Sequence, residues 1–439
     1  SRAAMVEAIQ TFGNRLQQQG AVGLFYYAGH GVQLAWRNYL IPVDAVLNNA
    51  DDVRANTVEL NSLLQALTLA KNPMNVIILD ACRDNPFGSR ARSDQKGLSQ
   101  FDAPPGSLLA YATSPGNVAS DGEGANGLYT ANLLRELQVP DAKIEDVFKR
   151  VRLHVRRSTR GQQIPWESTS LEEDFYFLPP RNQQPIRKPD ADVLARQFEE
   201  ELAIWQKVSA ARDVKLLEDF MLRYPSGRFT ELAQLRLERL LAAQGEKRIQ
   251  IVSSEQNPFS KGTAMAGTRY KVGDSQTYRV LDPYSKVVNE TYTQTVTQIT
   301  DSEVVFDTGL TTDLLGNIVI TRDGRRFGES QFLPLEFAVG KRWSTRFSVV
   351  TVKGPGVVEM EVRCAARERI TVPAGTFNAF RLEGQGFSIG GWGSSQLSLI
   401  RWIDPGRVKR PVASVDRRTS QSGRIVAAER EELVAYRES

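Results

Sequence analysis

The chain has few residues of the two types that most often build metal and disulfide sites. Among its 439 residues are only two cysteines and two histidines. A structural zinc site typically needs about four such ligands, so a thiolate or histidine metal site is not expected. A disulfide between Cys82 and Cys364 would have to join distant parts of the chain. What stays open is a single reactive cysteine with a histidine partner.

Long apolar runs and an excess of one charge are also absent. No stretch approaches the ~20 apolar residues of a membrane span, so no membrane-spanning helix is expected. The 55 basic and 51 acidic residues nearly balance, so charge does not indicate a nucleic-acid partner. The chain begins at Ser1 within an expected helix, and any signal peptide would lie upstream.

Over residues 1–178, patterns of buried strands alternate with helical ones. Continuous apolar runs predict buried strands, and apolar spacing near 3.6 predicts helices. We expect strands at 21–28, 74–81, 107–113 and 174–178, and helices at 1–19, 57–70, 127–138 and 142–157. This alternation predicts an α/β domain with a mostly parallel sheet.

Three further segments follow. Residues 179–190 are rich in proline and predict a linker. The pattern of residues 191–247 predicts two or three short helices, about one and a half tetratricopeptide-like units. Such a module either binds a protein partner or acts as a spacer. Residues 266–437 alternate with period 2 and predict an all-β domain, a sandwich or a barrel. Within it, Cys364 falls on the inner face of a strand, as an inert core cysteine does.

Two motifs follow predicted strands. FYYAGHG, residues 25–31, places His30 between two glycines, and VIILDACRDNPF, residues 76–87, places Cys82 just past the next strand. Carboxyl ends of parallel strands meet at one edge, where active sites form. A neighbouring imidazole can generate the reactive thiolate. The alternatives are a histidine that caps a turn and an inert, buried cysteine.

Two other segments carry weaker signals. Residues 106–134 predict a strand followed by a glycine-rich, acidic loop, which forms either a pocket wall or a solvated connection. His154 lies in the basic run KRVRLHVRR. This run is typical of a solvated helix face, so His154 is not expected to be catalytic.

Several motifs occur in a characteristic order: YAGHG at 27–31, NYLIPVDA at 38–45, ILDACRDNPF at 78–87 and AYATSPGNVASDGEGANGLYT at 110–130. In this order they resemble the caspase/metacaspase superfamily, in particular bacterial caspase-like (orthocaspase-type) cysteine peptidases, over residues 1–178. His30 and Cys82 lie 52 positions apart, close to the ~50 typical of caspases. The resemblance implies a multidomain cysteine endopeptidase with a caspase-like α/β domain.

The resemblance also implies roles for individual residues. Cys82 would be the nucleophile, His30 its base, and the backbone N–H groups of Gly31 and Cys82 the oxyanion donors. Asp80, two residues before the nucleophile, would line the pocket for a basic side chain. Asp121, in the loop after the next strand, is a second candidate acid because of its place in the sequence. Caspases have Gln-Ala-Cys where this chain has Asp-Ala-Cys, which favours protein or peptide substrates cut after Arg or Lys. Alternatively, Asp80 caps the turn that holds Cys82.

The remaining expectations concern completeness and regulation. The sheet of this family begins with two strands that precede the segment seen here, so the strand at 21–28 would lose a neighbour. If those strands are needed, this chain alone is inactive, and the alternative function is a non-catalytic interaction scaffold. No cofactor is evident; calcium activation is implied by resemblance alone, without EF-hand spacing. Self-processing is expected within 88–100, and a bacterial envelope, periplasmic or secreted location is favoured.

Overall fold

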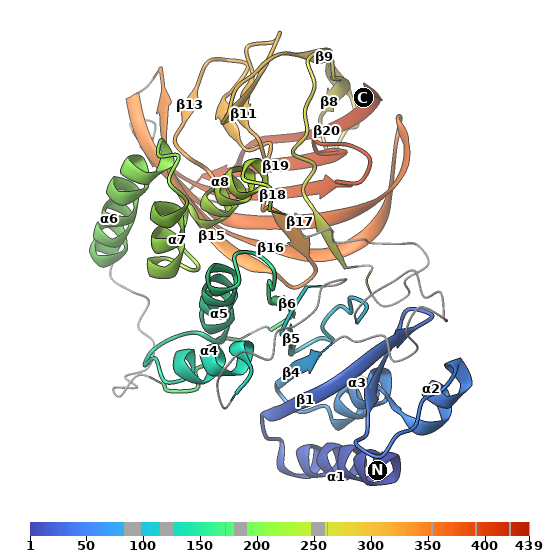
Figure 1. The fold of residues 1–439 in the computed structure, drawn as a ribbon. Coiled ribbons are helices and arrows are strands. Elements are labelled where there is room, and N and C mark those ends of the chain that lie inside the picture. Colours follow the sequence, from blue (N-terminus) through green and yellow to red (C-terminus); the bar gives the residue numbers. More distant parts are fainter. Residues whose placement is uncertain are drawn as a thin grey trace. The chain divides into compact units, whose positions relative to one another are not determined.

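The computed structural model describes residues 1–82, 98–114, 126–171, 173–179, 191–246, 260, 262–352, 354–390, 393–420 and 423–438. These residues form two compact units (Figure 1). The first unit holds the described residues up to 189, together with 212–225 and 237–261. The second holds those of 190–211, 226–236 and 262–439.

The first unit is an α/β layer. Its helices are α1 (Arg2–Gln19), α2 (Ala50–Asn56), α3 (Leu60–Ala70), α4 (Leu128–Glu136) and α5 (Ile144–Ser158). Its strands are β1 (Gly23–Leu34), β2 (Arg37–Ile41), β3 (Val58–Glu59), β4 (Asn75–Cys82), β5 (Ser107–Tyr111) and β6 (Trp166–Thr169). Helix α1 ends at Gly20, whose left-handed backbone (φ 57°) is the usual glycine stop.

The sheet of this unit is mixed. The described strands pair in the order β3-β2-β1-β4-β5-β6. The pairs β1–β4 and β4–β5 are parallel, whereas β1–β2, β2–β3 and β5–β6 are antiparallel. The predicted parallel arrangement is therefore confirmed only for the central strands. Strand β2 returns from β1 through a two-residue turn, and so short a connection permits only antiparallel pairing.

Strand β4 is covered on both faces. Ile77 and Leu79 pack with side chains of α1 and α3, and Val76 and Ile78 pack with those of α4 and α5. All four are at most 2% exposed. Two-sided burial requires a continuous apolar run, which explains why the sequence reveals this strand so clearly.

The strand predicted at 174–178 is not part of the sheet. Strand β6 takes the edge position beside β5, and residues 174–178 contribute one isolated bridge, Lys143 to Tyr176. The rings of Phe175 and Phe177 meet edge to face at 5.1 Å and pack against the core below α4 and α5. The apolar alternation at 174–178 therefore reflects two phenylalanines that anchor this segment to the core, and not a strand of the sheet.

Strand β1 is longer than predicted. It continues through the glycines to Leu34, and Ala35 and Trp36 form the turn to β2, both with positive φ (50° and 65°). Strand β2 pairs with β1 only from His30 to Leu34. Among the described strands, residues 23–29 of β1 therefore have β4 as their one neighbour.

The helices predicted as one module are α6 (Ala191–Ser209), α7 (Val214–Arg223) and α8 (Thr230–Ala243). They are divided between the units: α6 and the start of α8 belong to the second, α7 and the rest of α8 to the first. In the second unit, the Trp205 ring stacks on Phe229 at 5.8 Å. Glu231 of α8 bonds to Lys341 at 2.7 Å, which fastens the start of α8 to the β domain.

The β domain is a closed barrel of twelve described strands. In order around the barrel they are β10 (Glu303–Phe306), β11 (Thr311–Asp313), β12 (Ile318–Ile320), β13 (Arg326–Phe327), β15 (Arg342–Thr351), β16 (Gly354–Val372), β17 (Gly375–Gly390), β18 (Gly393–Ile403), β19 (Ala413–Ser420), β20 (Ile425–Arg437), β8 (Ser275–Leu281) and β9 (Val288–Ile299). Strands β7 (Thr263–Met265) and β14 (Glu336–Ala338) form a separate pair. Of the two predicted forms, the barrel is the one observed.

Cys364 lies in β16 and is 1% exposed. It packs in a cluster with Val358, Met360 and Val362, so its predicted place on the inner face is confirmed. The alternation ends there, because the register shifts between Cys364 and Ala366.

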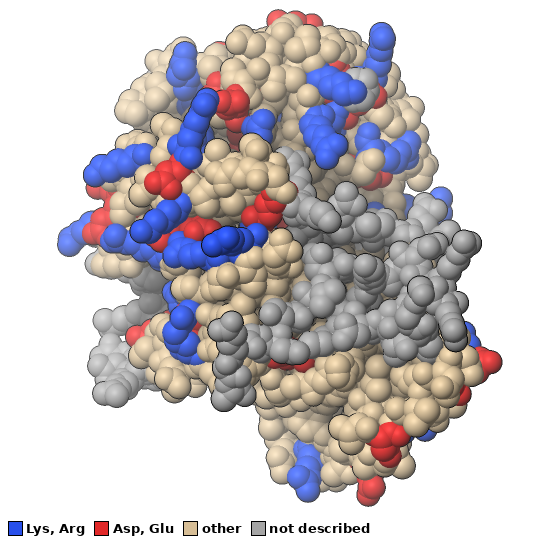
Figure 2. Space-filling view, in the orientation of Figure 1, with Lys and Arg blue, Asp and Glu red and all other residues tan. Residues whose placement is uncertain are grey.

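Charges of both signs are mixed at the surface. On the face shown in Figure 2, Lys and Arg side chains lie among Asp and Glu side chains in both units. Within the described residues, no helix is long and apolar enough to cross a membrane.

Candidate active site

Three of the predicted site residues, His30, Asp80 and Cys82, lie where β1 and β4 run side by side (Figure 1). In the parallel register Ala28 pairs with Asp80, Gly29 with Ala81 and His30 with Cys82. His30 and the backbone of Cys82 are thus neighbours across one strand spacing of ~4.8 Å. Both residues occupy the last paired position of the two strands, at the carboxyl end of β4.

His30 is exposed and lies within a strand, not in the turn that the sequence suggests. Its backbone carbonyl accepts a hydrogen bond of 2.7 Å from the hydroxyl of Tyr27. The same hydroxyl lies 3.0 Å from the carbonyl oxygen of Ile41 in β2. Burial raises the pKa of Tyr27, which keeps it a donor. Tyr27 therefore ties the His30 segment to β2, a role that the sequence did not reveal.

The glycines beside His30 serve close packing. Neither has a positive φ. A Cβ atom on Gly29 would lie 2.8 Å from the Tyr27 hydroxyl oxygen, and one on Gly31 would lie 2.9 Å from Cδ2 of Leu98. The backbone at these two glycines is therefore extended, and the neighbouring side chains leave little room for a Cβ atom.

Asp80 is half-buried and is held by residues of two other elements. One of its carboxylate oxygens, Oδ2, accepts a short hydrogen bond from the hydroxyl of Thr130 in α4. Thr130 Oγ1 lies 2.7 Å from the hydroxyl oxygen of Tyr26 in β1. Neither Thr130 nor Tyr26 was predicted. Each belongs to a quoted motif region, but nothing in their spacing points to Asp80.

Some predicted residues lie outside the described part of the chain. These are Asp121, most of the loop at 88–100 and much of the glycine-rich loop within 106–134. No group of three or more His, Cys, Asp and Glu residues that could hold a metal ion occurs among the residues that are described.

The basic helix α5 is not the solvated face that its sequence predicts. Arg152 pairs with Glu167 at 2.8 Å, with the two side chains 15% and 11% exposed. Arg157 pairs with Glu218 of α7 at 2.7 Å. The run of positive charge is therefore largely neutralised inside the first unit.

His154 faces Glu136, with Nε2 and Oε1 3.2 Å apart. Burial, and then the charge of Arg135, lower the pKa of His154. His154 therefore contacts the carboxylate of Glu136 on α4, and neither residue is part of β1 or β4.

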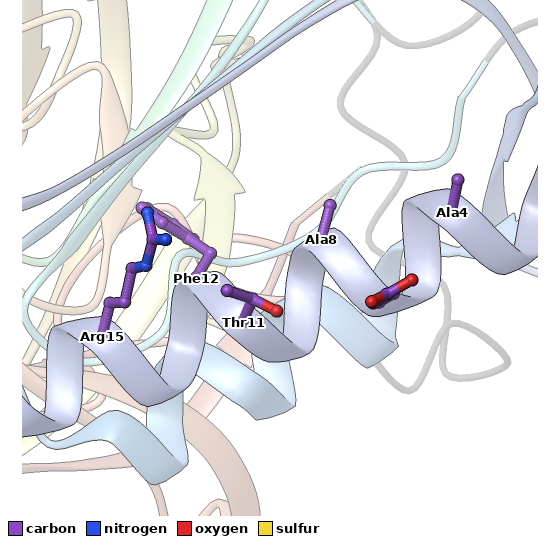
Figure 3. A pocket seen from close by; sticks show the side chains of 6 residues that line it. Ala4, Ala8, Thr11, Phe12 and Arg15 are labelled. Atoms are coloured by element: carbon purple, nitrogen blue, oxygen red, sulfur yellow. The ribbon is translucent and has the colours of Figure 1, made fainter.

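A shallow hollow of about 400 Å³ lies along α1 (Figure 3). It is lined by Ala4, Glu7, Ala8, Thr11, Phe12 and Arg15. All six belong to one helix and none to β1 or β4, so this hollow is not part of the candidate site.

Comparison with known proteins identifies the class of domain to which this site belongs. Residues 1–176 match the family of the caspase domain, peptidase family C14. This part of the chain is a caspase-like domain.

Individual similarities are lower. The mucosa-associated lymphoid tissue lymphoma translocation protein 1 homolog of Mus musculus is 25% identical over 193 residues, which are 42% of this chain and 22% of that protein. The chain thus spans about a fifth of the length of this curated relative.

Two solved structures are similar at low levels. Caspase-1 of Spodoptera frugiperda is 15% identical and covers 42% of this chain and 74% of its own, with a TM-score of 0.30. A protein of Parabacteroides distasonis whose name calls it a lipoprotein is 11% identical, with a TM-score of 0.27; the match covers 40% of this chain and all of that one. Similarities at this level carry no conclusion about function.

Proposed function

We propose that the caspase-like domain is a cysteine endopeptidase in which Cys82 attacks the peptide bond and His30 takes its proton. The observation that carries this proposal is the register that pairs His30 with Cys82 on adjacent parallel strands. One strand spacing puts an imidazole within reach of a group at position 82. A thiolate formed in this way is the reactive species.

The same edge supplies a place for the developing oxyanion. Attack by the sulfur on the carbonyl carbon moves an electron pair to the carbonyl oxygen. We assign the stabilising donors to the backbone N–H groups of Gly31 and Cys82, which lie where the pairing of β1 and β4 ends. Losing one such donor typically lowers the rate ~10²–10³-fold. His30 then protonates the leaving amine, and water hydrolyses the thioester.

Asp80 is proposed to select the residue before the cut. Its carboxylate lies two positions before Cys82 and is half-buried, and partial desolvation strengthens its attraction for a cation. A guanidinium can bind a carboxylate through two parallel hydrogen bonds, whereas an ammonium binds as a point charge. Peptides with Arg should therefore be cut best and those with Lys next. Asp should be excluded because like charges would meet.

The test is a peptidase assay with matched peptides that differ only in the residue before the cut. Cys82→Ala and His30→Ala should each remove nearly all activity on the Arg peptide. The double variant should be no worse, because residues that act as one unit are not additive. Asp80→Ala should remove the preference for Arg, whereas Cys364→Ala, in the barrel core, should leave turnover intact.

Turnover by Cys82→Ala would refute the mechanism. Cleavage after Asp, or an Asp80→Ala chain that still prefers Arg, would refute the pocket. Peptide binding without any cleavage would instead favour the alternative function, a non-catalytic interaction scaffold.

A further inference from the structure

A chain of hydrogen bonds leads from the surface of β1 to the carboxylate of Asp80. Thr130 donates to Oδ2 of Asp80, and a threonine hydroxyl has a single proton to give. In the 2.7 Å contact between Thr130 and Tyr26, the donor must therefore be Tyr26. Burial is the main cause that raises the pKa of Tyr26, and the charge of Asp80 raises it further, which keeps its proton in place.

The hydrogen-bonded residues Tyr26, Thr130 and Asp80 lie at the edge of the apolar core. On the α4 and α5 side of the sheet, β4 contributes Val76 and Ile78 to the core before it reaches Asp80. Tyr26 is 42% exposed, and Asp80 and Thr130 are half-buried. The carboxylate therefore lies at the boundary between the core and solvent, where it is partly desolvated.

Stability alone does not require this arrangement. Replacing both partners of a buried hydrogen bond by apolar groups of the same shape can be nearly neutral. Here a carboxylate is instead held by a donor in the first turn of α4, where the positive end of the helix also favours an anion. The fixed orientation of this carboxylate indicates that its negative charge has a role in binding.

We propose that Thr130 and Tyr26 are positioning residues that orient Asp80 to receive the guanidinium of a substrate arginine. The inference rests on the proposed function, which assigns Asp80 to the substrate pocket. Thr130 fixes the rotation of the carboxylate, and Tyr26 fixes Thr130. Less side-chain freedom is then lost when the guanidinium binds, so that binding is tighter and depends more strongly on geometry.

The test measures binding, so it does not depend on turnover. The chain with Cys82→Ala is titrated with a fluorescent tetrapeptide ending in arginine, and with the same peptide ending in citrulline. Citrulline has the shape of arginine without its charge. The ratio of the two affinities reports the contribution of the charge recognised by Asp80.

In the Cys82→Ala background, Thr130→Val should narrow the arginine-to-citrulline ratio by about tenfold, the size of one hydrogen bond to a charged group. Thr130→Ser, which keeps the hydroxyl, should restore the ratio to within about twofold. Tyr26→Phe, which removes the hydroxyl group that holds Thr130, should narrow the arginine-to-citrulline ratio by about threefold. Thr68→Val is the matched control, because the Thr68 hydroxyl donates to the backbone carbonyl of Leu64 in its own helix; the ratio should not change.

Coupling to Asp80 is tested in the chain that also carries Asp80→Asn, where Thr130→Val should cause no further change. The proposal is overturned if Thr130→Val leaves the ratio intact, even if it lowers stability, or if it acts equally with and without Asp80. An arginine-to-citrulline ratio near one in the chain that carries Cys82→Ala alone also overturns the proposal. If the ratio behaves as expected but no peptide is cut, the positioning role stands and the proposed peptidase function fails.

Discussion

At the scale of single residues, Cys364 shows how burial controls a thiol. It is 1% exposed in β16, and burial raises its pKa to about 12. The thiol is therefore protonated near neutral pH, and a protonated thiol is a poor nucleophile. This environment explains why Cys364 is not a candidate for catalysis although it is one of only two cysteines.

We expect iodoacetamide near neutral pH to leave Cys364 unmodified in the folded chain and to modify it after unfolding in denaturant. If Cys82 is the nucleophile, the folded chain should take up one equivalent, and Cys82→Ala should take up none. Mass spectrometry of the peptide that contains residue 364 checks this. A labelled Cys364 in the folded chain would show that the barrel opens far more readily than its packing suggests.

At the scale of elements, the hairpin of β1 and β2 positions the His30 segment. Its two-residue turn requires positive φ at both positions, which usually selects Asn or Gly. This chain instead has Ala35 at φ 50° and Trp36 at φ 65°. A left-handed backbone is unfavourable for a residue with a Cβ atom, and Asn tolerates it better. The turn is therefore a strained connection next to the candidate site.

Ala35→Asn should stabilise the first unit by about 0.5 kcal/mol, because it relieves this strain at an exposed position. The matched control is Ala8→Asn in α1, which is also exposed and should destabilise by about 0.5 kcal/mol through lower helix propensity. Denaturant unfolding monitored by circular dichroism measures both. Two changes of the same sign would mean that the turn does not carry the strain.

In helix α5, the environment of the arginines depends on ion-pair partners that the local sequence does not show. These arginines look like a solvated basic face, but their acidic partners, Glu167, Glu218 and Glu246, come from distant parts of the chain. Local sequence shows the basic run and cannot show the partners. Pairing at low exposure differs energetically from a surface salt bridge, because removing one partner leaves an uncompensated charge.

At the scale of the whole molecule, Asp313 is one group through which pH is expected to act on the stability of the barrel. Burial raises the pKa of this carboxyl to about 6 from an ordinary 3.8, against hydrogen bonds from Asn317 and the backbone. At pH values between 3.8 and about 6, the carboxyl of Asp313 holds a proton in the folded chain that it releases in the unfolded chain. Stability must then fall as pH rises through this range, by up to about 3 kcal/mol.

Asp313→Asn should therefore reduce the decrease in barrel stability between about pH 4 and pH 7. It should not abolish the decrease, because burial also raises the pKa of Glu329, to about 7. Asp416→Asn is the control, because Asp416 is 55% exposed and no comparable change is expected. Thermal unfolding across this range measures the slope for each chain. A slope unchanged by Asp313→Asn would assign the pH dependence to other groups.

Several features could be predicted from sequence because they depend on local periodicity. The continuous apolar run of β4 and the alternation around Cys364 each identify a strand and its buried face. The order of motifs also identified the caspase-like domain, which the family match confirms.

By itself, the sequence determined that the apolar runs at 74–81 and 107–113 are buried strands, that Cys364 faces a core, and that His30 and Cys82 follow consecutive apolar runs. Only the tertiary structure decided that β2 pairs antiparallel with β1, that residues 174–178 leave the sheet, and that Thr130 and Tyr26 hold Asp80. Thr130 lies 50 positions from Asp80, and Tyr26 lies 104 positions from Thr130. Periodicity records how a residue sits on its own element. The choice of a partner depends on how elements far apart in the chain pack together, and no local pattern contains that information.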